Sequence, residues 1–119
     1  MRREIVLPAT REQVWAALTD SEQLSAWFEA EVDIDPRPRG DVTARHPDGT
    51  IRRGTVIAAS APYRLVVAWE GARDARGSEV EASRVEFTLE AVTDGTRLTV
   101  IEAPLTVAAP ETFLLQAAR

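Results

Sequence analysis

The chain is 119 residues long with 14 basic and 19 acidic residues, and its net charge of −5 argues against binding to nucleic acid or to an anionic membrane surface. It contains no cysteine and one histidine, which excludes a disulfide framework, a cysteine nucleophile and a metal site built from these side chains within one chain. Because no apolar run approaches the roughly 20 residues that span a bilayer, and the first residues lack the pattern of a secretory signal, we expect one cytoplasmic domain, residues 1–119, with no membrane insertion.

The beginning of the chain predicts a strand followed by a helix. Residues 4–7 are rich in strand-forming side chains and end at Pro8, which cannot continue a ladder of hydrogen bonds. Thr10 and Gln13 have the spacing of a capping box, in which each side chain accepts a hydrogen bond from the backbone amide of the other residue, so a helix begins here. Its buried face would carry Val14, Ala17 and Leu18.

A second short helix is predicted directly after the first. Asp20 or Ser21 can cap it, because both side chains accept hydrogen bonds from free backbone amides. Apolar side chains spaced three and four residues apart predict its buried face: Leu24, Trp27 and Phe28.

From residue 31 onward, apolar residues recur with the period of two that is typical of β-strands. Prolines and glycine in residues 36–40 separate the first two strands. The sequence His-Pro-Asp-Gly at 46–49 and the sequence Thr-Asp-Gly-Thr at 93–96 predict tight hairpins. Consecutive strands joined by such turns indicate an antiparallel meander.

Three further features complete the predicted fold. Residues 71–78 have no period and should form an exposed, mobile loop. The apolar phase changes near Ser83 and Arg84, which indicates a β-bulge. After the last strand, Pro110 can begin a helix over residues 111–119. The order is β-α-α-β(6)-α, and helices packed on one face of a sheet make an α+β fold.

Three segments of the chain resemble the START-like, or helix-grip, superfamily, and within it the branch named for the activator of the heat-shock-protein-ninety ATPase. They are residues 5–28, which contain IVLPATREQVWAALTD and AWF, residues 62–69, PYRLVVAW, and residues 94–102, DGTRLTVIE. The resemblance implies a curved seven-stranded antiparallel sheet around a long C-terminal helix, with an apolar cavity between them that binds a hydrophobic small molecule.

The predicted C-terminal helix departs from the pattern of this superfamily. At about 1.5 Å per residue, residues 111–119 would span only roughly 13 Å, which is unusually short. The cavity would then be open at one end, or a second copy of the chain would complete it. We therefore expect a homodimer formed through the region near this helix.

Side chains that would line the cavity are chosen from the inward strand phase and from the resemblance. They are Trp27, Phe28, Val67, Trp69, Phe87, Val100, Glu102 and Phe113. Simple core packing would also account for the apolar ones. Glu102 continues the inward phase of Leu98 and Val100, so its carboxylate would point into apolar space and orient or protonate a ligand; a solvated strand end is the alternative.

Other polar residues are not expected to form a site. His46 precedes a turn, where exposed histidines are common. A local basic patch is one interpretation of four arginines, and solvated strand edges are the simpler one: Arg37, Arg39, Arg52 and Arg53. No motif pairs a serine with the histidine, so a catalytic triad has no support. We predict no catalytic residue, no metal and no cofactor.

Three functions are open after the sequence has been considered. The leading one is binding of a hydrophobic small molecule in the cavity. The second is an enzyme of the aromatase or cyclase kind, which would use a cavity carboxylate as a general acid or base. The third is a chaperone-type or other protein-interaction module, which the name of the family branch suggests.

Overall fold

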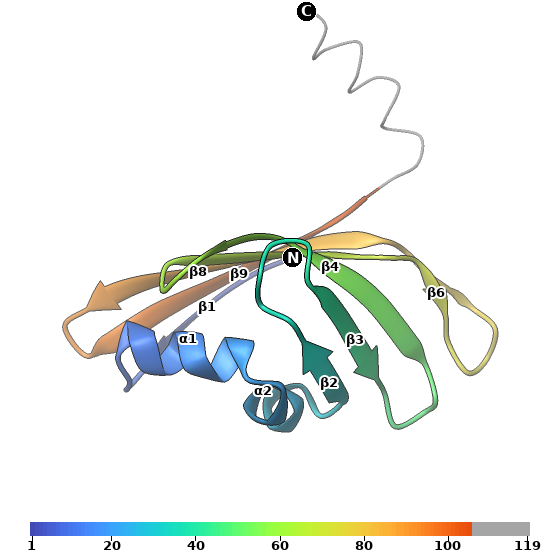
Figure 1. Ribbon diagram of the computed structural model, residues 1–119, viewed down its shortest axis with the longest axis horizontal. Coiled ribbons are helices and arrows are strands. Elements are labelled where there is room, and N and C mark those ends of the chain that lie inside the picture. Colours follow the sequence, from blue (N-terminus) through green and yellow to red (C-terminus); the bar gives the residue numbers. More distant parts are fainter. Residues whose placement is uncertain (106–119) are drawn as a thin grey trace, which may run out of the picture.

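The computed structural model describes residues 1–105, in which one curved antiparallel sheet carries two helices on its concave side (Figure 1). The predicted helix over residues 111–119, its Phe113 and the expected dimer contact lie outside the described residues. The elements are β1 (Arg2–Leu7), α1 (Arg11–Thr19), α2 (Ser21–Phe28), β2 (Glu31–Ile34), β3 (Asp41–Arg45), β4 (Ile51–Ser60), β5 (Arg64–Trp69), β6 (Ala72–Arg73), β7 (Glu79–Val80), β8 (Ser83–Val92) and β9 (Gly95–Pro104).

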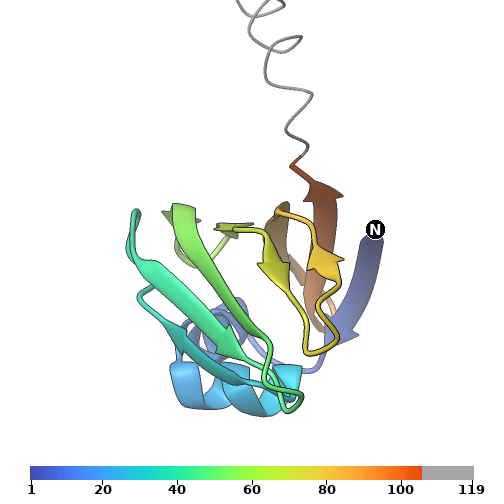
Figure 2. The same cartoon turned by 90° about the vertical axis from the view of Figure 1, so that its right-hand side faces the viewer.

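The main sheet has seven strands in the order β1-β9-β8-β5-β4-β3-β2, and every neighbouring pair is antiparallel. Chain order is followed except that β1 returns to pair with β9, where Ile5 lies opposite Leu98. Figure 2 shows the curvature of the sheet, with β3 and β4 at one side of the molecule and β9 and β1 at the other. The predicted α+β fold with a seven-stranded meander is confirmed.

Both helices begin at the predicted caps. The Thr10 hydroxyl accepts a hydrogen bond from the Gln13 amide at 3.1 Å, and the Gln13 side chain accepts one from the Thr10 amide at 2.8 Å. Asp20 caps α2 through the Gln23 amide at 3.0 Å. In residues 1–105 neither helix is long and apolar enough to cross a membrane.

Two serine hydroxyls attach α2 to the edge strand β2. The Ser25 hydroxyl accepts from the Val32 amide at 2.8 Å and is 3.1 Å from the Val32 carbonyl oxygen, and the Ser21 hydroxyl accepts from the Ile34 amide at 3.0 Å. These bonds satisfy backbone groups that an edge strand would otherwise leave unpaired. They also place α2 beside β2, at one end of the concave face.

The position of α2 changes the expected burial of its aromatic residues. Leu24 is buried, but Trp27 is 43% exposed and Phe28 is 51% exposed. The prediction that all three face the core was therefore wrong for the aromatic pair. The reason is that α2 packs on the sheet edge, so only a narrow stripe of the helix is covered. The buried core of the described chain joins Val14 and Leu18 of α1, and Leu24 of α2, to the concave faces of the strands.

Two predictions for the middle of the chain also need correction. Residues 71–78 are not only loop, because β6 pairs with β7 in a separate two-stranded ribbon. Strand β8 pairs without interruption from Ser83 onward, so the predicted bulge there is absent. The apolar phase changes because Val80 belongs to the ribbon and Val85 to the main sheet. The irregularity lies instead in β4, between Val56 and Ala58.

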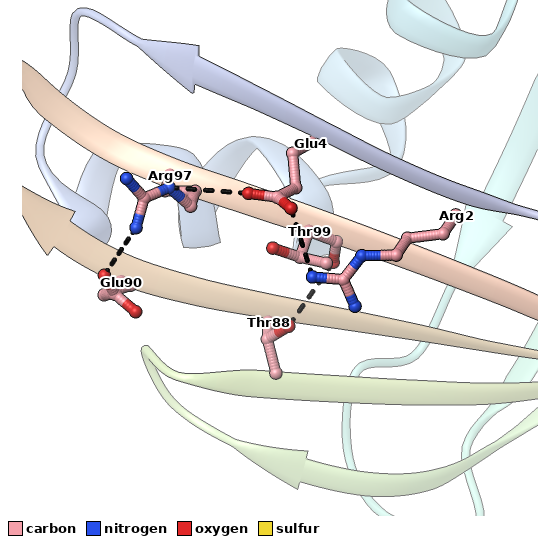
Figure 3. Close-up of polar contacts among 6 residues, drawn as sticks. All are labelled: Arg2, Glu4, Thr88, Glu90, Arg97 and Thr99. Atoms are coloured by element: carbon pink, nitrogen blue, oxygen red, sulfur yellow. Dashed lines mark hydrogen bonds and ion pairs between the residues drawn. The ribbon is translucent and has the colours of Figure 1, made fainter.

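The outer face of the sheet, opposite the core, carries charged pairs that link three strands (Figure 3). Arg97 of β9 lies 3.6 Å from Glu4 of β1 and 2.8 Å from Glu90 of β8. Arg2 contacts the same Glu4 at 3.1 Å. Exposed pairs of this kind add little net stability, but they make the outer face over β1, β8 and β9 polar. The main hydrophobic core lies on the opposite, concave face.

Candidate ligand-binding site

A cavity of about 220 Å³ lies on the concave face. Strand alternation places side chains of β2 to β5, β8 and β9 toward it. The helices, the N-terminal residue and the connections at Ala30 and His46 contribute the remainder of its wall. Its apolar wall consists of Met1, Leu18, Leu24, Phe28, Ala30, Val32, Ile34, Val42, Ala44, Leu65, Val67, Trp69, Val85, Phe87 and Val100. Its polar lining residues are His46, Arg52 and Glu102.

Six of the side chains predicted from the sequence border this cavity. They are Phe28, Val67, Trp69, Phe87, Val100 and Glu102. Trp27 does not border it, because it lies on another side of α2 and lines a shallow hollow beside the end of β1 and α1. Phe113 is outside the described residues. The structure therefore brings these six together, and their contact with a ligand remains a prediction.

Glu102 is held in place at the cavity by Ser83. The Ser83 hydroxyl donates a hydrogen bond of 2.9 Å to Oε2 of Glu102. Ser83 is only 6% exposed and lies at the start of β8, opposite Trp69 of β5. A hydrogen bond to an ionised acceptor is stronger than one between neutral groups, so it orients the carboxylate. Sequence reasoning placed Glu102 on the inward phase but did not find Ser83.

Arg52 is the largest departure from the expected site. It lies opposite Ala44 on the concave face instead of at a solvated edge. Its Nη2 donates to the carbonyl oxygens of Glu70 at 3.2 Å and Glu81 at 3.0 Å, and its guanidinium lies over the Trp69 ring at 5.6 Å. Burial lowers the pKa of Arg52 below its ordinary value, and the negative charge of Glu102 opposes this effect. Arg52 is thus a half-buried cation in an apolar wall.

His46 also lies at the cavity, which corrects its expected exposure in the turn. It follows Val42 and Ala44 with the same period of two, one residue beyond the end of β3. The concave phase therefore extends past the strand. With Arg52 and Glu102, His46 gives the apolar cavity a group of titratable side chains. No group of three or more metal-binding side chains in residues 1–105 could hold an ion.

Sequence comparison agrees with this architecture. Residues 8–116 match the protein family described as Activator of Hsp90 ATPase homolog 1-like protein. The chain belongs to this family. The resemblance of the sequence to the START-like superfamily is thereby confirmed, and an apolar cavity beneath a curved sheet is consistent with membership of the Activator of Hsp90 ATPase homolog 1-like family.

Solved structures with the same fold come from several bacteria. Protein MLL2253 from Mesorhizobium loti is 21% identical with a TM-score of 0.78, over 95% of this chain and 82% of that one. A protein from Rhodobacter sphaeroides is 27% identical with a TM-score of 0.68, over 96% and 78%. CalU16 from Micromonospora echinospora is 26% identical with a TM-score of 0.66, over 90% and 60%. Among curated proteins, none matches the chain. These likenesses support the helix-grip fold of this family member.

Proposed function

We propose that the protein binds a hydrophobic small molecule in the concave cavity. The observation that carries this proposal is a cavity of about 220 Å³ whose wall is almost entirely apolar. Burial of apolar ligand surface there would contribute about 25 cal/mol per Å² before the cost of ordering the ligand. Membership of the family and the fold of its relatives are consistent with this function.

Core packing within residues 1–105 does not account for the cavity wall. In a simple core, large apolar side chains are covered by one another. Here Leu65 and Val67 are buried, while Trp69 and Val100 are only partly covered and Phe28 is 51% exposed. The described part of the chain therefore leaves apolar surface available on the concave side. A ligand of similar character would cover it.

Blocking the cavity tests this function. Val100→Trp adds an indole to the concave face, whereas Ile101→Trp adds the same group on the outer face of the same strand. We expect the wild type and Ile101→Trp to bind the uncharged fluorophore N-phenyl-1-naphthylamine saturably, and Val100→Trp to lose most of this binding. Absence of saturable binding to the wild type, or equal binding by both variants, would contradict the proposal.

A second candidate function, an enzyme of the aromatase or cyclase kind, is favoured by the presence of both Glu102 and Arg52 in the lining of the cavity. The Glu102 carboxylate would accept a proton from the carbon next to a ketone. The electron pair of the broken C–H bond would delocalise onto the ketone oxygen to give an enolate, and Arg52 would stabilise that negatively charged oxygen. Deuterium exchange into 2-tetralone in D₂O tests this step by NMR. If the wild type exchanges no faster than Glu102→Gln, this function is excluded.

The remaining expectations stay proposals. We infer one domain over residues 1–119, a cytoplasmic location and a homodimer formed near the helix predicted over residues 111–119. Light scattering across a wide concentration range tests the homodimer, and a strictly monomeric protein would exclude it.

A chaperone-type role is suggested only by the name of the family. Its test is stimulation of Hsp90 ATPase activity, and no stimulation at a large excess of protein would exclude it.

A further inference from the structure

Arg52 and Glu102 carry opposite charges into the same cavity without forming an ion pair. No nitrogen of Arg52 lies within 4.0 Å of an oxygen of Glu102. Both nevertheless line the cavity, and the charge of Glu102 acts to raise the pKa of Arg52. A donor-only group and an acceptor-only group thus face the same space with a gap between them.

Each group has hydrogen-bonding capacity left over. Nη2 of Arg52 is used by the carbonyl oxygens of Glu70 and Glu81, and its Nε is buried without a partner. Its Nη1 has no hydrogen bond within residues 1–105. Oε2 of Glu102 accepts from Ser83, while Oε1 has no hydrogen bond in the same part of the chain. Two donor nitrogens of Arg52 and one acceptor oxygen of Glu102 are therefore without a partner in residues 1–105, on two side chains that line the cavity.

The charges select the kind of polar group that fits between them. A ligand carboxylate would be attracted to Arg52 but repelled by Glu102, and an ammonium group would meet the reverse situation. A neutral hydroxyl accepts from Arg52 with its oxygen and donates its hydrogen to Glu102. We propose that the cavity selects an apolar molecule with an uncharged phenol or alcohol group that bridges Arg52 and Glu102. This inference rests on the proposed binding function.

Matched two-ring probes test the selection by isothermal titration calorimetry. The probes are 2-naphthol, 2-naphthoate, 2-naphthylmethylammonium and 2-methylnaphthalene, which share one apolar body. We expect 2-naphthol to bind at least about tenfold more tightly than the other three, since hydrogen bonds to charged partners are of this strength. Equal binding of 2-naphthol and 2-methylnaphthalene, or tightest binding of either charged probe, would overturn the inference and leave the binding function intact.

Single variants then test whether the charges of Arg52 and Glu102, and not a general change in structure, determine the order of probe affinities. Glu102→Gln keeps the shape of the side chain but removes its charge, so 2-naphthoate should gain affinity and 2-naphthol should lose about tenfold. Arg52→Met keeps the apolar stem, so 2-naphthylmethylammonium should gain affinity. Arg53→Met, on the exposed opposite face of β4, is the control and should bind like the wild type. If neither variant changes the order of probe affinities, the inference fails; if no probe binds the wild type, the binding function fails with it.

Discussion

Gly54 of β4 and Trp69 of β5 lie opposite each other, and the indole approaches the glycine so closely that a Cβ there would sit 3.0 Å from Cε3 of the ring. The same Cβ would be 2.7 Å from the Ala68 carbonyl oxygen. The bare backbone at residue 54 thus lets Trp69 take its position in the cavity wall. Side-chain packing of the site depends on this one missing methyl group.

Gly54→Ala should therefore destabilise the protein by about 1–3 kcal/mol, the usual cost of overpacking a closely packed position. Urea unfolding measures the change. Gly71→Ala is the matched control, because its Cβ would come no closer than 3.4 Å to Val80 and should cost much less. A loss at Gly54 no larger than that at Gly71 would show that the backbone at Ala68 and the ring of Trp69 both move aside freely.

Ser83→Ala should weaken binding of 2-naphthol while leaving 2-methylnaphthalene unaffected. Ser83 does not line the cavity itself, but its hydroxyl holds Oε2 of Glu102 at 2.9 Å. It is a positioning residue, and its loss should cost several-fold in the affinity for the hydroxyl probe. Calorimetry with both probes distinguishes positioning from a general loss of structure. Ser83→Thr retains a hydroxyl and should restore much of the preference; equal losses for both probes would refute the positioning role.

Contact quenching locates the bound molecule among the tryptophans. Trp69 borders the cavity, whereas Trp27 lines a separate hollow. We expect 6-bromo-2-naphthol to quench wild-type fluorescence, because bromine quenches an indole that it touches. The quenching should persist in Trp27→Phe and largely disappear in Trp69→Phe. The reverse pattern would place the ligand beside α1 and the end of β1.

Stability at acid pH should depend on Glu86. The Arg64 guanidinium, 2.6 Å away, holds the pKa of Glu86 below its ordinary value of 4.5, and Arg84 acts in the same direction. A lowered folded-state pKa stabilises the protein above pH 4.5, and this contribution is lost as the pH falls through the lowered value. Glu86→Gln should therefore lose less stability than the wild type between pH 6 and roughly pH 3.

Urea midpoints at several pH values measure this dependence. Because the pair is partly exposed, we expect a coupling of about 0.5–1 kcal/mol between Arg64 and Glu86 in a double-mutant cycle at neutral pH. Glu90→Gln is the control, since Glu90 is more exposed and pairs with Arg97 at the outer face. Identical pH profiles for the wild type and Glu86→Gln would show that the ion pair has no part in acid stability.

Much of the fold could be predicted because its signals are local. The capping residues Thr10 and Asp20 are set by nearest-neighbour chemistry, and both appear as predicted. The hairpin at Gly95 follows from turn preferences in the same way. The exposure of Trp27 could not be read from the helix period alone, since the period predicts a face but not what covers it. Packing of α2 on the edge of the sheet decided that.

The residues of the candidate site also differ in whether the local strand pattern or a partner distant in the sequence determines their position. Glu102 can be predicted because it continues an apolar phase, whereas the paired arginines at 52 and 53 have the pattern of a solvated strand edge, and this misplaces Arg52. A phase signal was present, since Arg52 shares its face with Gly54 and Val56. His46 likewise extends the phase of Ala44. Ser83 shares the inward phase of Val85 and Phe87, but nothing in that phase indicates its partner Glu102, which lies 19 residues away.

The pairing of β1 with β9 has a consequence for how the chain acquires its structure during synthesis. Ile5 meets Leu98 only after nearly the whole described sequence has left the ribosome. Until then β1 has no neighbouring strand, and its apolar side chains remain in an unpaired segment. Pairing across such a separation makes folding slow relative to helix or hairpin formation. β1, the first strand of the described chain, therefore pairs with the sheet only after β9, the last one, has been synthesised.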